Sequence, residues 1–184
     1  MASWAGYLSV LGRVVRFNYR YMEARQKRPD PHAVLIDAHR EALAHASREQ
    51  HGSIVLAGKS MGSRIACHLA LEVSVSGLVC LGYPLRGQNG KLRDEVLIAL
   101  RTPIMFVQGT RDSLCPLDEL EAVRKKMVAP SVLHVVEEGD HSLSVSKTWL
   151  KRNATSQALV DGKVLEAIRA FVVTLSEVHS TARS

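Results

Sequence analysis

The fold is decided by residues 53–65, which read Ser53-Ile54-Val55-Leu56-Ala57-Gly58-Lys59-Ser60-Met61-Gly62-Ser63-Arg64-Ile65. Four apolar residues, Ile54 to Ala57, predict a short buried strand that ends at Gly58. Residues 60–73 then carry apolar side chains at helical spacing, namely Ile65, Ala66, Leu69, Ala70 and Val73. The stretch therefore predicts a strand, a sharp turn and a helix, with Ser60 on the turn.

Gly58 and Gly62 stand two positions on either side of Ser60. A sharp strand-to-helix turn forces the serine into a strained backbone conformation, and we expect that only residues without a β-carbon fit at these two positions. Ser60 would then project from the sheet at a helix N-terminus, where free backbone N–H groups, that of Met61 first, can stabilise an oxyanion. The alternative is a glycine- and serine-rich turn before an ordinary helix, since this spacing also recurs by chance.

Strand and helix patterns alternate along the rest of the chain. Further buried strands are predicted at residues 14–19, 77–82, 103–108 and 132–136, and helices at residues 32–50, 92–100, 117–127 and 158–175. This alternation predicts an α/β fold, with a mostly parallel sheet covered by helices on both faces. We expect one domain over residues 1–184, with a poorly defined segment at 1–12 and a polar tail at 176–184. His39 and His45 are expected on the exposed face of their helix.

Three residues whose side chains can take part in catalysis each follow a predicted strand. They occur in the order Ser60, Asp112, His141. Because parallel strands end at the same edge of a sheet, we expect the three side chains to meet there. A serine hydroxyl is a poor nucleophile without a neighbouring base, and the base needs a third group to orient it. The order therefore predicts Ser60 as nucleophile, His141 as base and Asp112 as the residue that orients His141.

Alternatives exist for two of these residues. Asp112 could instead cap the turn before Pro116, and Asp140 is a rival carboxylate, although it is too close to His141 in sequence to reach the ring easily. Of the other histidines, His134 lies inside a predicted strand and His179 in the polar tail, which makes both weaker candidates for the base.

Four separated motifs resemble one family. They are residues 58–64, residues 80–85, residues 103–109 with Asp112, and residues 139–142. Together they are similar to the α/β-hydrolase-like domain shared by the testis-expressed protein thirty and regulatory subunit three of the nonspecific-lethal chromatin acetyltransferase complex, a relative of the dienelactone-hydrolase branch. The resemblance runs from about Val14 to Leu175. It implies an α/β-hydrolase fold with Ser60, Asp112 and His141 in the triad positions, and it leaves both the substrate and a protein partner open.

The sequence departs from that family at one point. The family pattern places a strand between the predicted strands at residues 14–19 and 54–57, and this strand ends in a His-Gly-x-Gly type loop that supplies a second oxyanion N–H. No such segment stands in the sequence. We therefore expect an N-terminally shortened form that lacks N-terminal strands and whose flanking strand edges are unpaired or closed up. Loss of one oxyanion donor alone lowers the rate by about 100- to 1,000-fold.

The composition of the chain limits which classes of protein and of site remain possible. A chain of 184 residues with 46% hydrophobic content suits one globular domain. No apolar run approaches the roughly 18 residues of a membrane span, and residues 1–12 lack a signal-peptide pattern, so we expect a cytoplasmic protein, with a nuclear one as the alternative. Cys67, Cys80 and Cys115 show no paired spacing, which predicts reduced core residues, and no metal-ligand spacing is found.

The net charge of +6 is uneven, because the first 28 residues carry six basic residues against Glu23 alone. A basic flank attracts nucleic acid or acidic partners. Without a recognition helix or an aromatic-rich binding motif, we interpret this flank as a solvated surface, and nucleic-acid binding is not expected.

The residues together predict a serine hydrolase that acts on a carboxylic ester or thioester through an acyl-enzyme on Ser60, with no metal or organic cofactor. The segment from Leu85 to Leu100, where related enzymes insert a lid, is short, which predicts an open cleft for small or extended acyl groups. Lys59 adds positive charge beside Ser60. The alternative is a non-catalytic interaction module, which the missing oxyanion loop favours. The oligomeric state is left open.

Overall fold

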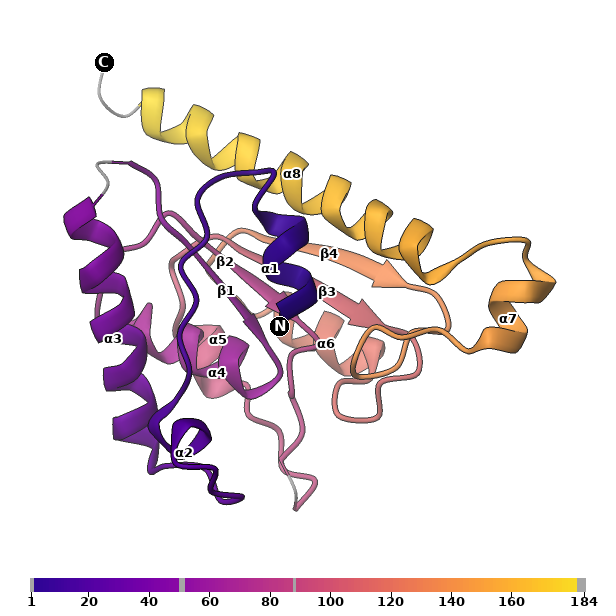
Figure 1. Ribbon diagram of the computed structural model, residues 1–184, viewed down its shortest axis with the longest axis horizontal. Helices are drawn as coiled ribbons and strands as arrows, with labels where there is room; N and C mark the ends of the chain where they lie inside the picture. The colour runs from indigo at the N-terminus through magenta and orange to yellow at the C-terminus, as the bar shows by residue number, and fades with distance from the viewer. Residues whose placement is uncertain (1, 50–51, 88, 182–184) are drawn as a thin grey trace.

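The core of the protein is a parallel sheet. The computed structural model describes residues 2–49, 52–87 and 89–181, and within them the sheet has four strands in the order β1-β2-β3-β4 (Figure 1). These strands are β1 (Val55–Lys59), β2 (Gly77–Leu81), β3 (Ile104–Gly109) and β4 (Ser131–Val136). All three neighbouring pairs are parallel, so all four strands end at the same edge of the sheet.

Helices cover both faces of this sheet (Figure 1). They are α1 (Ala2–Leu8), α2 (Arg20–Glu23), α3 (His32–Glu49), α4 (Met61–Leu69), α5 (Glu95–Ala99), α6 (Leu117–Arg124), α7 (Lys147–Arg152) and α8 (Gln157–Thr181). β2 and β3 are buried along their whole length, because their apolar side chains point alternately to the two helical layers. The predicted α/β fold with helices on both faces is confirmed.

Two apolar cores follow from this alternation. Ile104 and Phe106 point to one face, where they pack with residues of α4, α5 and α6. Met105 and Val107 point to the opposite face, where α1 and α8 cover them. Cys67, Cys80 and Cys115 are all buried in the first core as free thiols, as the sequence predicts.

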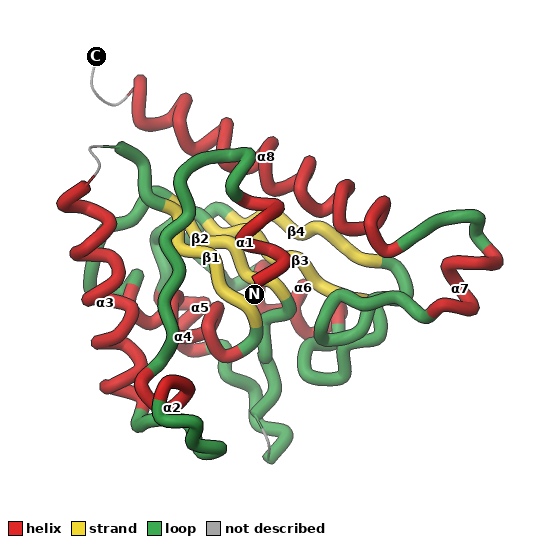
Figure 2. The backbone as a smooth tube through the Cα atoms, in the orientation of Figure 1, coloured by secondary structure: helices red, strands yellow, loops and turns green. Residues whose placement is uncertain are grey.

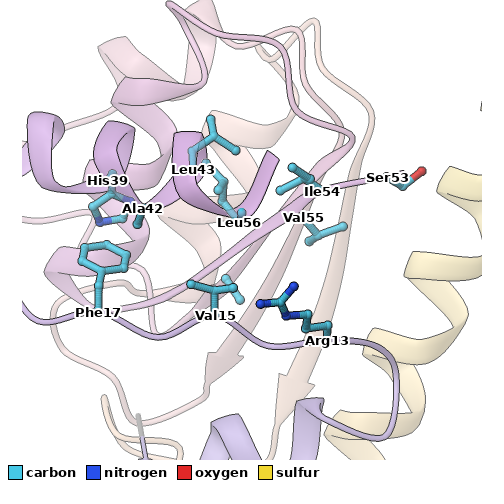
Figure 3. A pocket seen from close by; sticks show the side chains of 12 residues that line it. Arg13, Val15, Phe17, His39, Ala42, Leu43, Ser53, Ile54, Val55 and Leu56 are labelled. Atoms are coloured by element: carbon cyan, nitrogen blue, oxygen red, sulfur yellow. The ribbon is translucent and has the colours of Figure 1, made fainter. Parts of the chain in front are cut away.

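The strand predicted at residues 14–19 is wrong. Residues 13–19 form no strand, and Figure 2 shows them as a loop that runs between α3 and β1 toward α2. A groove of about 170 Å³ separates this loop from β1, with Val15 and Phe17 on one side and Val55 on the other (Figure 3). The loop therefore lies too far from β1 for backbone pairing, and β1 is an edge strand of the described sheet.

Both ends of the chain contain more helix than their sequences predict. Residues 2–8 form α1, in which Trp4 is only 5% exposed and packs in the second core. At the other end, α8 extends to Thr181 and so includes most of the predicted tail, whose residues 182–184 lie outside the described part. Within the residues that the structure describes, no helix is both long enough and apolar enough to cross a bilayer.

His39 is not on an exposed face, which corrects the sequence-based expectation. Its side chain is 7% exposed, because residues 17–21 fold over α3. The Tyr19 hydroxyl lies 2.6 Å from His39 Nε2, and Phe17 packs edge-on against the imidazole. Burial lowers the pKa of His39 to about 4 and raises that of Tyr19 above its ordinary value, so both groups are neutral near pH 7. His45, on the same helix, is exposed as expected.

Candidate active site

Ser60 occupies a strained turn between β1 and α4. Its backbone has φ 52° and ψ −121°, a conformation that residues with a β-carbon rarely adopt. Hydrogen bonds hold the turn in place, since the Ser60 N–H donates to the Leu81 carbonyl at 3.1 Å. The Ser60 carbonyl accepts from the Ser63 hydroxyl at 2.6 Å and from the Arg64 N–H at 3.3 Å. The sheet and the first turn of α4 thus fix the strained serine from both sides.

The two glycines of the turn have different roles. A β-carbon at Gly58 would lie 2.4 Å from the Ser63 backbone nitrogen, so Gly58 is required by the close approach of strand and helix. At Gly62 the nearest atom to such a β-carbon would be the Tyr19 hydroxyl oxygen, at an ordinary 3.8 Å. The expectation that neither position accepts a β-carbon is therefore wrong for Gly62, which lies in the first turn of α4 beside open space.

His141 lies between the other two predicted residues. Its Nε2 is 2.8 Å from Ser60 Oγ and its Nδ1 is 2.7 Å from Asp112 Oδ2. An ionised Asp112 can only accept hydrogen bonds, so Nδ1 carries the proton, and Nε2 is left to accept the Ser60 hydroxyl. The structure thus brings Ser60, Asp112 and His141 together at the edge of the sheet where the parallel strands end.

Asp140 takes no part in this arrangement. Its Oδ1 accepts the N–H groups of Ser142 at 2.7 Å and Ser144 at 2.9 Å, so the carboxylate stabilises its own turn. Of the two other candidates for the base, His134 lies within β4, and the His179 side chain is outside the described residues. The geometry therefore favours Asp112 over Asp140 as the partner of His141.

Asp112 is fixed by three donors. Its side chain is buried, and Oδ1 accepts the Leu114 N–H at 2.9 Å. Oδ2 accepts from His141 and also from the side-chain amide of Gln108. The Gln108 carbonyl oxygen in turn accepts the Tyr83 N–H at 3.1 Å, which ties the end of β3 to the segment after β2.

Sequence reasoning did not identify Gln108 as part of the site. Its signal was present, because Gln108 is a polar residue in the otherwise apolar, fully buried β3. A buried amide requires partners for both its oxygen and its nitrogen, and here these partners are Tyr83 and Asp112.

The backbone N–H of Met61 is the candidate oxyanion donor. Met61 is the first residue of α4, and among the described residues its N–H donates no hydrogen bond. An N–H at a helix N-terminus, next to the Ser60 hydroxyl, is suited to bind developing negative charge. Lys59 lies at the end of β1 with a partly exposed side chain. Among the described residues, no three His, Cys, Asp or Glu side chains are grouped as metal ligands would be.

A family model for an alpha/beta hydrolase domain matches residues 5–173. The chain belongs to this alpha/beta hydrolase family. The match includes both edges of the described sheet and all three residues that meet at its carboxyl end. The narrower resemblance to the testis-expressed and nonspecific-lethal proteins is not decided by this model.

Solved alpha/beta hydrolase structures share the fold. An alpha-beta serine hydrolase homologue from Coxiella burnetii has a TM-score of 0.65 at 24% identity, and the match covers 76% of this chain and 66% of that one. An esterase domain from Rhodothermus marinus has a TM-score of 0.65 at 15% identity, covering 92% and 77%. A lidless serine hydrolase from Xanthomonas campestris has a TM-score of 0.59 at 22% identity, covering 76% and 62%. The chain thus spans less than two thirds of the first and third proteins, and at these identities the likeness shows the fold alone.

Proposed function

We propose that this protein is a serine hydrolase that cleaves a carboxylic ester or thioester through an acyl-enzyme on Ser60. The observation that carries the proposal is the unbroken chain of contacts from Asp112 through His141 to Ser60, with 2.7 Å and 2.8 Å steps. Such a chain activates a hydroxyl only when the base has the correct tautomer, and the buried Asp112 carboxylate selects that tautomer.

The first half of the proposed reaction forms the acyl-enzyme. His141 Nε2 takes the Ser60 proton as Oγ attacks the acyl carbon, and the carbonyl oxygen becomes an oxyanion beside the Met61 N–H. Asp112 stabilises the imidazolium that results. The tetrahedral intermediate then collapses, His141 returns the proton to the leaving alkoxide or thiolate, and the acyl group stays on Ser60.

The second half is hydrolysis of that acyl-enzyme. His141 Nε2 accepts a proton from water, and the resulting hydroxide attacks the acyl carbon. As the second tetrahedral intermediate collapses, His141 gives the proton back to Ser60 Oγ and the carboxylic acid leaves. Every proton in this scheme moves through His141, so no metal or organic cofactor is required.

The expected partner is a small acyl ester or thioester. The short segment between β2 and α5 leaves little chain to build a lid, which supports an open cleft for small or extended acyl groups. The four motifs that resemble the testis-expressed and nonspecific-lethal proteins support placing the chain in that branch of the family. The same resemblance motivates the alternative of an interaction module, which the ordered triad geometry does not favour.

The test is intact-mass analysis after reaction with a fluorophosphonate probe. The wild-type protein should gain one adduct, and Ser60→Ala should gain none. Ser142→Ala is the matched control, because this exposed serine lies next to His141 in sequence and the variant should keep the adduct. A cooperatively unfolding wild-type protein that forms no adduct would contradict the proposal and favour the interaction module.

A further inference from the structure

The strand β4 forms an outer edge of the described sheet. It pairs with β3 alone and is the last strand on the side of the sheet away from α3 (Figure 1). The Pro130 and Val136 carbonyls accept the N–H groups of Ile104 and Thr110 at 2.9 and 3.1 Å. Backbone groups of alternate residues point to the same side of a strand. The even-numbered residues of β4 therefore direct their backbone groups toward β3, and the odd-numbered ones direct theirs outward.

Only part of this outward side is already bonded. The Ser131 carbonyl accepts Arg124 Nη2 at 2.8 Å, and the Ser131 hydroxyl accepts Arg124 Nε at 3.1 Å. In contrast, the N–H and C=O groups of Leu133 and Val135 form no hydrogen bond within the described part of the chain. An unpaired strand edge of this kind is a template for a further strand. We refer to Leu133 and Val135 with their open backbone groups as the β4 edge.

Apolar side chains at the β4 edge are exposed on both faces of the sheet. Val132 is 47% exposed and Val135 is 41% exposed. Val132 is in register with Met105, so it lies on the face that α8 covers, and Val135 lies on the opposite face. A further strand beside β4 would cover part of both valines, which the helices of this chain leave in solvent. The other edge of the sheet differs, since the loop at residues 13–19 lies beside β1.

The side chains at the two ends of β4 carry opposite charges. Lys125 and Lys126 lie in the turn before the strand, Glu137 follows its last residue, and all three are exposed. Among the residues that the structure places, none of the three forms an ion pair, whereas the adjacent Arg124 and Glu138 are already paired. The strand is thus flanked by unpaired positive charge at its beginning and by unpaired negative charge at its end.

We propose that the β4 edge binds a second copy of this chain, with the two β4 strands antiparallel about a two-fold axis. Antiparallel pairing places the lysine end of each strand beside the glutamate end of the other, whereas parallel pairing would bring like charges together. With Leu133 opposite Val135 of the second copy, the two residues exchange both hydrogen bonds, and the symmetry repeats them. This pairing uses every open group of the β4 edge and joins the two sheets into one, so the assembly closes at two copies.

Sedimentation velocity of the full chain measures this association. The pairing uses neither Ser60 nor its two partners, so the inference is independent of the proposed function and is tested without any substrate. The wild-type protein should change from monomer to dimer at concentrations up to about 100 μM, as expected for a small interface. A wild-type protein that stays monomeric throughout this range would overturn the inference.

Reversed charges test the antiparallel arrangement. Lys126→Glu and Glu137→Lys each place like charges at both ends of the paired strands, and each should raise the dimer Kd by about 10-fold. The double variant Lys126→Glu/Glu137→Lys should return the Kd to within about threefold of wild type, because the two reversed charges attract each other across the axis. A double variant that associates more weakly than both single variants would contradict antiparallel pairing.

A proline tests the backbone contact. Val135→Pro removes an N–H that points to solvent in the single chain, which an edge strand tolerates, but the dimer loses this hydrogen bond in both copies. The dimer Kd should therefore rise by about 100-fold. Val135→Thr is the matched control, because it keeps the N–H and the branched shape, and its Kd should stay within about threefold of wild type.

Two further measurements locate the interface. Urea unfolding shows whether Val135→Pro folds cooperatively, and if it does not, the charge-reversed variants decide, because they change exposed side chains alone. Val173→Lys replaces a 52% exposed valine toward the other end of α8, where Leu175 packs against Gly77 of β2, and it should leave the dimer intact. A dimer that is weakened by Val173→Lys but not by Lys126→Glu or Val135→Pro would lie on α8, and the inference would be wrong.

Discussion

His141 Nε2 lies 2.8 Å from Ser60 Oγ, although 81 positions separate the two residues. Ser60 follows β1 at one edge of the described sheet and His141 follows β4 at the other, so the chain after β4 must cross the ends of two strands. Two glycines permit this crossing. A β-carbon at Gly109 would lie 2.1 Å from the Gly139 carbonyl oxygen, and one at Gly82 would lie 2.4 Å from that of His141. The triad distance therefore depends on backbone packing as much as on its own side chains.

The two glycines of the Ser60 turn should respond differently to alanine. Gly58→Ala places a β-carbon 2.4 Å from the Ser63 backbone, so we expect a loss of stability of about 2 to 4 kcal/mol and of probe labelling. Gly62→Ala meets only the Tyr19 hydroxyl at 3.8 Å and should change stability by less than about 1 kcal/mol. Urea unfolding of both variants measures the difference. Equal destabilisation by the two substitutions would contradict the geometry of the turn.

Substitutions of Asp112 and Asp140 should differ in their effect on the reactivity of Ser60. Asp112→Asn keeps the shape of the side chain but favours the wrong tautomer of His141, so labelling of Ser60 should slow by about 1,000- to 10,000-fold. Asp140→Asn keeps an oxygen that can accept the Ser142 and Ser144 N–H groups, and it should slow labelling by less than about tenfold. Stopped-flow or quenched labelling rates measure both. A larger effect of Asp140→Asn would reassign the orienting residue.

Gln108 should help to hold Asp112 in position beside His141. Gln108→Leu removes one donor to Asp112 and leaves the Tyr83 N–H without its acceptor, in a fully buried position. We expect a loss of about 1 to 3 kcal/mol in the free energy of unfolding, because a buried donor becomes unsatisfied. Labelling should also slow for the folded fraction, since Asp112 loses one of its three donors. A variant that unfolds earlier in urea but labels at the wild-type rate would limit Gln108 to a structural role.

The buried His39 should make stability depend on pH. Its pKa is lowered by burial to about 4 in the folded protein, against about 6.5 when unfolded. Below pH 6.5 the unfolded chain therefore binds a proton that the folded chain resists, so stability falls as the pH is lowered toward 4. This group alone should contribute a loss of roughly 2 to 3 kcal/mol between pH 7.5 and 4.5.

Urea unfolding of wild type and His39→Gln at the two pH values isolates that contribution. The variant should lose less stability on acidification, whereas His45→Gln, on the exposed part of the same helix, should behave like wild type. His68, whose pKa is also lowered to about 4, is present in all three proteins and cancels in the comparison. Equal pH dependence of wild type and His39→Gln would show that His39 has the same pKa in the folded and unfolded states, which would contradict its burial as a neutral group.

Much of the fold could be predicted because each strand of the sheet coincides with a short run of apolar residues. The apolar runs that became β2, β3 and β4 are bounded by glycine, proline or polar residues, and their predicted limits differ from the observed ones by one residue. Residues 14–19 carry a similar pattern and yet form no strand. A strand requires hydrogen bonds from a neighbouring backbone, and the groove beside β1 keeps these residues from that neighbour.

The sequence by itself determined the four strands β1 to β4 and the helices that alternate with them, the sharp turn at Ser60, and the set of residues that follow strand ends. These features depend on residues a few positions apart, which share one local conformation. Only the tertiary structure decided that His141 reaches Ser60 across the sheet, that Gln108 and not Asp140 supports the site, and that His39 is buried. Each of these depends on contacts between segments that lie far apart in the chain, and no local pattern specifies which segments will touch.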